Sequence, residues 1–285
     1  MISCPKVLES IMVKQYQDLY IYYLKGHLET DQNLLSIDYL GNWQEDEFSF
    51  LFFSISAENR IENLLKDQPH LDLLDSFHMS YDDWQGGALS PVRIGHFLIT
   101  PPWIDCRCRS DEQKIMLDPG VVFGTGTHPT TRDCLKAIDL ACRGKTCRRV
   151  LDIGTGTGLL ALAAAKSGAK QVLAVDLNFL AAKTALKNIR LNQLNEKIIA
   201  VQGDAEKFMD YPADLVITNI HFAVMEQLVK SKGFLNKKQF ILSGLMRSQA
   251  HIIEKQLAGL PITLIKRWDH NKAWYTCWGK INGNN

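Results

Sequence analysis

The sequence has almost no net charge and no long apolar run. Its 32 Lys and Arg residues nearly balance its 31 Asp and Glu residues, for a formal net charge of +1. This balance argues against a broad surface for nucleic acid or membrane but leaves room for a local basic patch. No apolar segment is long enough to span a bilayer, and the N-terminal MISCPKVLES lacks the apolar region of a signal peptide. We therefore expect a cytoplasmic protein with no membrane association and no direct nucleic-acid binding.

Metal and disulfide patterns are also missing. The seven cysteines are an odd number spread through the chain, and without an export signal they predict reduced thiols. None has the spacing of a zinc site, since Cys106 and Cys108 would share one face of a strand and Cys142 and Cys147 flank a basic turn. We expect no metal site.

Two phosphate-binding motifs are absent as well. The glycine-rich loop FGTGTHPTT continues with His128-Pro129 where an ATP-binding loop needs Gly-Lys-Ser/Thr. A second glycine cluster, Gly154 to Gly158, reads GxGxG and is one residue shorter than the GxGxxG of dinucleotide folds. An ATP site is thereby excluded, and a nicotinamide dinucleotide site is disfavoured.

The best-defined pattern that is present runs from Val150 to Asp176. An apolar strand leads into the three glycines, a helix of strong helix formers follows, and a second apolar strand ends on Asp176. An acidic residue about twenty positions after such glycines is placed to bind the two hydroxyls of an adenosine ribose. A tight turn in an ordinary α/β domain would explain the glycines but not the carboxylate. The pattern therefore predicts a nucleoside site.

The shorter turn, with Asp152 just before it, resembles motif I of the Rossmann-like methyltransferases, whose cofactor S-adenosylmethionine has no phosphate. Past Asp176, strands and helices alternate, which favours a parallel sheet with right-handed crossovers. The last two strands, 262–268 and 273–278, are joined by the short turn DHNK and form a hairpin. We expect an α/β fold with a Rossmann-like seven-stranded methyltransferase sheet whose last strand is reversed. Its remaining strands are predicted at 197–201, 214–220 and 240–245, and its helices at 179–194, 223–229 and 249–257.

The N-terminal region predicts a small α+β domain. Its expected elements are a short amphipathic helix within Met1 to Gln17, strands at 19–24, 34–40 and 48–55 with GNWQEDE as a turn, and a helix at 58–66. We place this domain at 1–80, a proline-rich interdomain linker with one strand from Ile94 to Ile99 at 81–112, and the methyltransferase domain at 113–285. Within that last domain Thr130 or Thr131 is expected to cap a helix.

Several segments together resemble the PrmA family, the methyltransferases of large-subunit ribosomal protein eleven. They are LDPGVVFGTGTHPTT, DIGTGTG, AVDLN, ITNI, LSGLMRSQA and AWYTCWGK. The resemblance extends from about Tyr81 to Lys280, and FGTGTHPTT is its most specific part. It implies S-adenosylmethionine as the cofactor, lysine or α-amino groups of a protein as methyl acceptors, a large-subunit ribosomal protein as partner, and substrate recognition by the N-terminal domain.

The resemblance and the glycine argument together give a set of site residues. The expected cofactor-binding residues are Thr131, Asp152, Gly154, Gly156, Gly158, Asp176, Leu177, Asp204, Ala205 and Asn219. Asp204 is placed where many methyltransferases contact the adenine amino group, although it could instead only cap a turn. The expected catalytic residues are Asn219, Ile220, His221 and Phe222.

Two departures from the family pattern bear on the acceptor. The family continues its asparagine motif as NILA, whereas this chain has His221 and Phe222 after Asn219-Ile220. In addition, residues 27–33 leave little room for the helix that the family places between its first two strands. Both departures concern regions that would select the substrate, so the acceptor is open: a different protein or a small-molecule amine is the alternative.

Methyl transfer from a sulfonium to an amine is an in-line displacement, in which alignment supplies most of the catalysis. The side-chain oxygen of Asn219 and the carbonyl of Ile220 are candidates for orienting the amine. His221 is a candidate base or only a polar wall, and Phe222 lines the pocket or belongs to the core. We expect a monomeric protein N-methyltransferase. The alternatives are a nicotinamide-dependent oxidoreductase and a module that binds the cofactor without transfer.

Overall fold

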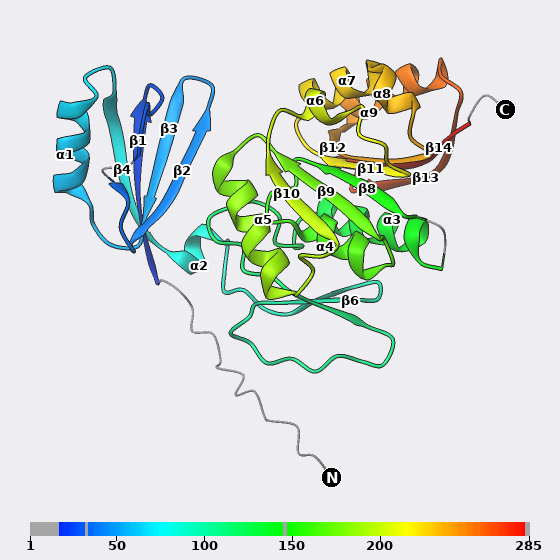
Figure 1. Ribbon diagram of the computed structural model, residues 1–285, viewed down its shortest axis with the longest axis horizontal. Helices are drawn as coiled ribbons and strands as arrows, with labels where there is room; N and C mark the ends of the chain where they lie inside the picture. The colour runs from blue at the N-terminus through cyan, green and yellow to red at the C-terminus, as the bar shows by residue number, and fades with distance from the viewer. Residues whose placement is uncertain (1–16, 32–33, 145–146, 283–285) are drawn as a thin grey trace, which may run out of the picture.

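The computed structural model describes residues 17–31, 34–144 and 147–282. In this part of the chain the strands form three sheets, with the orders β2-β3-β1-β4, β5-β6-β7 and β10-β9-β8-β11-β12-β14-β13. The four-stranded sheet stands apart from the seven-stranded sheet, which has helices on both faces (Figure 1). The helix expected within Met1 to Gln17 falls outside the described residues.

The N-terminal sheet is antiparallel and carries one helix. Its elements are β1 (Asp18–Lys25), β2 (Tyr39–Glu45), β3 (Phe48–Phe53), α1 (Glu58–Asp67) and β4 (Asp72–Ser80). The predicted helix is confirmed, because Ile61 and Leu64 of α1 pack into the core formed by this sheet. The described residues between β1 and β2 contain no α-helix.

Two predictions in this domain are wrong. The strand expected at 34–40 begins only at Tyr39 and continues through residues expected to turn, so that the turn is reduced to Asp46 and Glu47. Strand β4 was not predicted at all. It lies at the edge of the sheet and is largely exposed, so its sequence has no buried face to produce an alternating pattern.

Residues 81–116 form a short helix and the three-stranded sheet. The elements are α2 (Tyr81–Trp84), β5 (Val92–Ile94), β6 (Phe97–Thr100) and β7 (Gln113–Met116). The single strand expected from Ile94 to Ile99 is wrong, because Gly95 adopts φ +58° and turns the chain into a hairpin. Strand β6 then pairs in parallel with β7. Phe97 and Ile115 are fully buried in the core of the seven-stranded sheet, so this segment packs onto that sheet.

The seven-stranded sheet has the predicted architecture. Its strands are β8 (Arg149–Ile153), β9 (Gln171–Asp176), β10 (Ile198–Gln202), β11 (Leu215–Asn219), β12 (Gln239–Met246), β13 (Ile262–His270) and β14 (Trp274–Ile281). Strands β8 to β12 pair in parallel, and β14 is antiparallel to both of its neighbours. The reversed last strand is confirmed, and it lies between β12 and β13 inside the sheet.

Helices cover both faces of this sheet, and each face has its own core. The helices are α3 (Pro129–Cys142), α4 (Leu159–Lys166), α5 (Phe179–Leu191), α6 (Ala205–Phe208), α7 (Phe222–Lys230), α8 (Lys232–Leu235) and α9 (Arg247–Ala258). Helices α3 to α5 cover one face and α6 to α9 the other (Figure 1). No helix in the described parts of the chain has both the length and the apolar character needed to cross a membrane.

The N-terminal sheet contacts the larger domain through a separate apolar cluster. Ile21 and Phe52 of the small sheet pack there with Val122 and with Leu180 of α5. The contact is close at Gly41 of β2, where an added Cβ would lie 2.7 Å from Leu180 Cδ1. The end of β2 is thereby held next to the carboxyl edge of the large sheet.

Candidate functional site

A cavity of about 1170 Å³ lies at the carboxyl ends of the central parallel strands. Along the chain, β8 is followed by β9 and β10, which lie on one side of it in the sheet. The next strands, β11 and β12, lie on its other side. The cavity therefore lies at the point where the strand order reverses, which is where ligands bind in open α/β sheets. Its other wall comes from Asn42, Trp43 and Glu45 of β2.

The glycine turn forms the floor of this cavity. The backbone N–H groups of Gly154 and Thr155 both donate to the carbonyl of Val175, at 2.8 and 3.0 Å, which ties the end of β8 to β9. Gly154 has φ +69°, and a Cβ there would lie 2.0 Å from Ile220 Cγ2. A side chain at this position would clash with Ile220, so the turn requires glycine, and the residue itself lines the cavity.

Asp176 lies beside the turn and is bound to it. One carboxylate oxygen accepts from the N–H of Gly156 at 2.9 Å and the other from the N–H of Asn178 at 3.0 Å. Burial raises the pKa of Asp176 above its usual value, although these two hydrogen bonds oppose the shift. Each oxygen has a further lone pair available. The carboxylate is thus fixed in orientation and can still accept from a pair of hydroxyls.

Two of the predicted cofactor-binding residues do not line the cavity. Asp152 is completely buried beneath the turn and accepts from the hydroxyl of Thr155 at 2.6 Å. Burial raises the pKa of this carboxyl to about 7. Gly158 has φ +83° at the start of α4 and packs closely on Ala185. Both residues support the turn from behind.

Loop 123–131 is anchored to the glycine turn. The hydroxyl of Thr157 donates to the carbonyl of Gly124 at 2.7 Å. The prediction that Thr130 or Thr131 caps α3 is wrong, because Pro129 already occupies the first helical position and His128 precedes it as the cap. The His128 Nδ1 atom accepts from the N–H of Thr130. Burial lowers the pKa of His128, which favours the neutral ring that this acceptor role needs.

Thr131 is placed one residue further into α3, and its hydroxyl reaches the asparagine motif. The side-chain amide of Asn219 donates to Thr131 Oγ1 over 3.4 Å. This contact joins the loop and the end of β11. It also turns the Asn219 carbonyl oxygen away from Thr131 and toward Gly244.

Two oxygen atoms converge above Gly244. The Asn219 Oδ1 atom and the Ile220 carbonyl oxygen are each 3.1 Å from the point that a Cβ of Gly244 would occupy. Gly244 has φ +90° and lies in a bulge of β12, where the register shifts between Ser243 and Leu245. The bulge and the missing side chain leave a small space bounded by two hydrogen-bond acceptors. Such a space suits a neutral amine, which has N–H groups to donate.

The other predicted residues also line the cavity. The side chain of His221 is 90% exposed, and its Nε2 lies 3.9 Å from an oxygen of Glu45 on β2. Phe222 is half-buried and packs partly against the core of the α7 to α9 face. Leu177 is 73% exposed at the cavity. Asp204 lines the cavity next to Ala205, and it also caps α6 by accepting from the N–H of Glu206 at 3.1 Å.

Sequence reasoning did not identify several residues of this site. Gly244 had a readable signal, since a glycine inside the strand pattern LSGLM indicates a bulge or a close backbone approach. Trp43 and Trp274 line the cavity from β2 and β14. Trp274 belongs to the segment AWYTCWGK, but neither sequence neighbourhood indicates a cavity wall, because only the folded chain brings these strands to the cavity.

The chain was compared with known proteins. Residues 43–282 match the family model described as ribosomal protein L11 methyltransferase (PrmA). A ribosomal protein L11 methyltransferase of Exiguobacterium sibiricum is 37% identical over 179 residues, which are 62% of this chain and 56% of the relative. The protein of the same name from Desulfitobacterium hafniense is 41% identical over 182 residues, covering 62% and 57%. The chain thus spans little more than half the length of these relatives.

A solved structure shows the same fold. It is the crystal structure of ribosomal protein L11 methylase from Lactobacillus delbrueckii subsp. bulgaricus, which superposes with a TM-score of 0.59 at 28% sequence identity. The superposition covers 68% of this chain and 100% of that chain. Over this part of the chain, the fold is therefore similar to that of the methylase.

Proposed function

Because this chain belongs to the PrmA family of ribosomal protein L11 methyltransferases, we propose that it transfers a methyl group from S-adenosylmethionine to an amino nitrogen of a protein. The observation that carries the proposal is the convergence of Asn219 Oδ1 and the Ile220 carbonyl above Gly244. This space opens into the same cavity as the glycine turn and Asp176. A site for an amine thus adjoins a site for a nucleoside.

The residues present fit S-adenosylmethionine. Gly154 and Gly156 line the cavity, and Asp176 beside them is oriented for the two ribose hydroxyls. Asp204 is our candidate for the adenine amino group, and the exposed side chain of Leu177 is our candidate for its ring face. When bound, this cofactor supplies an electrophilic methyl group.

The chain's own contribution is to select and align the neutral amine. A lysine amine with a solution pKa of about 10.4 must lose a proton before it can act as a nucleophile. Two acceptor oxygens hold the two remaining N–H groups, so that the nitrogen lone pair points away from them. Alignment of this kind can contribute roughly 7 to 11 kcal/mol to lowering the barrier. We assign His221 to the wall of the acceptor site, since its ring is open to water and faces Glu45.

We infer that the acceptor is ribosomal protein L11, in agreement with the names of the relatives. A cytoplasmic location and a monomeric state are part of this proposal. The end of β2 supports a protein acceptor, because Trp43 and Glu45 extend the cavity wall beyond the cofactor region. His221 and Phe222 are the positions at which this acceptor site differs from the family pattern NILA.

The test is transfer of methyl-labelled cofactor to proteins. We expect label in one protein band of a ribosome preparation after incubation with the chain, and mass spectrometry of that band to show added mass on lysine or the N-terminal amine. The Asn219→Ala variant serves as the control for transfer. Label that reaches only small molecules would contradict a protein acceptor. Thermal stabilisation by NAD in place of S-adenosylmethionine would support the oxidoreductase alternative, and cofactor binding with no transfer would support a binding module.

A further inference from the structure

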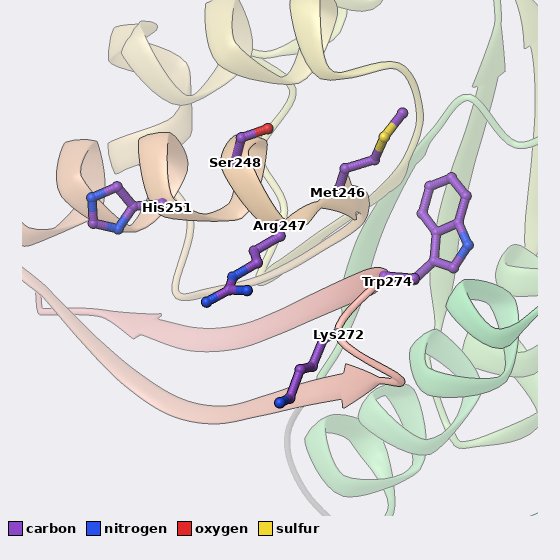
Figure 2. Close-up of a pocket in the computed structure, with 7 residues that line it drawn as sticks. Met246, Arg247, Ser248, His251, Lys272 and Trp274 are labelled. Atoms are coloured by element: carbon purple, nitrogen blue, oxygen red, sulfur yellow. The ribbon is translucent and has the colours of Figure 1, made fainter.

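A second cavity lies beside the first and is lined by basic side chains. It has a volume of about 660 Å³, and its lining residues are Met246, Arg247, Ser248, His251, Lys272, Ala273 and Trp274 (Figure 2). We propose that this basic cavity binds a carboxylate side chain of the protein substrate, close to the amine that is methylated. The proposal rests on the proposed function and adds to it a rule for choosing the substrate.

The three basic side chains come from two elements that meet at the cavity. Arg247 and His251 are four residues apart on α9 and therefore lie on one face of that helix. Lys272 belongs to the turn between β13 and β14, where the carboxylate of Asp269 accepts from its backbone N–H at 2.7 Å. In Figure 2 the side chains of Arg247 and Lys272 extend away from Trp274 toward the same side.

The side chains of Arg247, His251 and Lys272 have no carboxylate partner among the described residues. No carboxylate oxygen of the described residues lies within 4.0 Å of a side-chain nitrogen of Arg247, His251 or Lys272. Asp269, three residues before Lys272, is engaged by the turn, and Glu254, three residues after His251, is paired with Arg267 at 2.9 Å. A guanidinium presents two parallel N–H donors that match the two oxygens of a carboxylate. The cavity is thus available to an external anion.

The two cavities share a wall, which connects the anion site to the amine site. Met246 and Trp274 line both cavities and face each other as partners across β12 and β14. Arg247 is three residues beyond Gly244, and a chain of that length spans at most about 11 Å. An extended substrate advances roughly 3.3 Å per residue. An amine above Gly244 would therefore bring an acidic residue about three positions away to Arg247 and Lys272.

A peptide carboxylate fits this cavity better than a nucleic-acid backbone. Binding to nucleic acid relies on many phosphate contacts along a positive surface, whereas this chain has a net charge of +1. The wall between the two cavities is apolar, and Met246 is 52% exposed there. An apolar wall next to Arg247 and Lys272 suits a substrate in which the acidic side chain follows a short apolar stretch of peptide.

The experiment compares two fluorescein-labelled peptides by anisotropy. Each has a central lysine. At the second and third positions on both sides of that lysine, one peptide has glutamate and the other has glutamine. We expect the glutamate peptide to bind about tenfold or more tightly. The double variant Arg247→Glu with Lys272→Glu should abolish this preference. Lys170→Glu with Lys197→Glu is the matched control, since both lysines are exposed at the opposite edge of the sheet, before β9 and β10.

The outcomes separate this inference from the proposed function. Three outcomes would overturn the basic cavity as a carboxylate site. They are equal binding of the two peptides, absence of peptide binding, and an equal loss of peptide affinity in both double variants. In a competition experiment, an oligouridylate could displace the glutamate peptide at a lower concentration than the unlabelled peptide does. That result would assign the cavity to RNA and would also overturn the inference of a carboxylate site. Selective binding without methyl transfer would leave the inference standing and remove the proposed function. Calorimetry with S-adenosylmethionine should give the same affinity for both double variants.

Discussion

The side-chain amide of Asn219 donates to the hydroxyl of Thr131 over 3.4 Å, and this contact joins two segments that are 88 residues apart in the sequence. It decides which end of the amide faces Gly244. The carbonyl end and the backbone oxygen of Ile220 both lie 3.1 Å from the space that Gly244 leaves. Loop 123–131 thus takes part in orienting Asn219 at the proposed acceptor site.

Replacing Asn219 by alanine should reduce turnover more than cofactor binding. The variant loses one of the two oxygens that align the amine, and misalignment of this kind costs on the order of a hundredfold in kcat. Single-turnover transfer to the labelled acceptor protein measures the first quantity, and calorimetry with S-adenosylmethionine measures the second. A loss of affinity as large as the loss in rate would place Asn219 in cofactor binding alone.

Thr131→Val tests whether the hydroxyl acts through Asn219. The variant should lower kcat less than Asn219→Ala does, because the amide remains but is no longer oriented. In the double variant Thr131→Val with Asn219→Ala, we expect no loss beyond that of Asn219→Ala, since residues that act as one unit are not additive. Additive losses in kcat would mean that Thr131 contacts the ligand independently.

Asp176→Ala should weaken the binding of S-adenosylmethionine. A hydrogen bond to a charged group contributes about 1.5 to 3 kcal/mol, which corresponds to roughly ten- to a hundredfold in Kd. Asp176→Asn is the matched variant, since it keeps the shape and removes the charge. Calorimetry at neutral pH measures both. An unchanged Kd in the alanine variant would show that the ribose lies elsewhere in the cavity.

Gly244→Ala should weaken acceptor binding while it leaves the cofactor site intact. The added Cβ would lie 3.1 Å from both Asn219 Oδ1 and the Ile220 carbonyl, and it would narrow the space in front of these two oxygens, from which we expect the amine to approach. We expect kcat/KM for the acceptor to fall on the order of a hundredfold. Gly168→Ala is the control, because Gly168 has φ +110° with no atom within 4 Å of its would-be Cβ. Equal effects of the two substitutions would assign the loss to backbone strain.

Asp152 predicts a pH dependence of stability. Burial raises the pKa of this carboxyl from 3.8 to about 7. Between those values the folded state keeps a proton that the unfolded state has released, so the free energy of unfolding falls as the pH rises, by up to about 1.4 kcal/mol per unit. Asp152→Asn should remove this contribution. Urea unfolding from pH 4 to pH 8 measures it, with the exposed Asp105→Asn as control; parallel curves for wild type and Asp152→Asn would contradict the assignment.

Local physical chemistry accounts for what the sequence by itself determined. The strand, glycine turn and helix that start at Val150 follow from apolar runs, helix propensity and residues that tolerate positive φ, all of which act between near neighbours. The position of Asp176 follows from the same spacing, and the reversal of the last strand follows from the short turn before β14. Of the motifs that resemble the PrmA family, DIGTGTG, AVDLN and AWYTCWGK belong to these local segments.

Only the tertiary structure decided how the acceptor side is built. Gly244 is bulged at a position that its sequence indicates, but it meets Asn219 and Ile220 because β12 lies beside β11, and that pairing has no local cause. Trp43 reaches the cavity because the N-terminal sheet packs on α5, and Trp274 does so because β14 lies between β12 and β13. These contacts join residues far apart in the chain, so they depend on which apolar faces pack together.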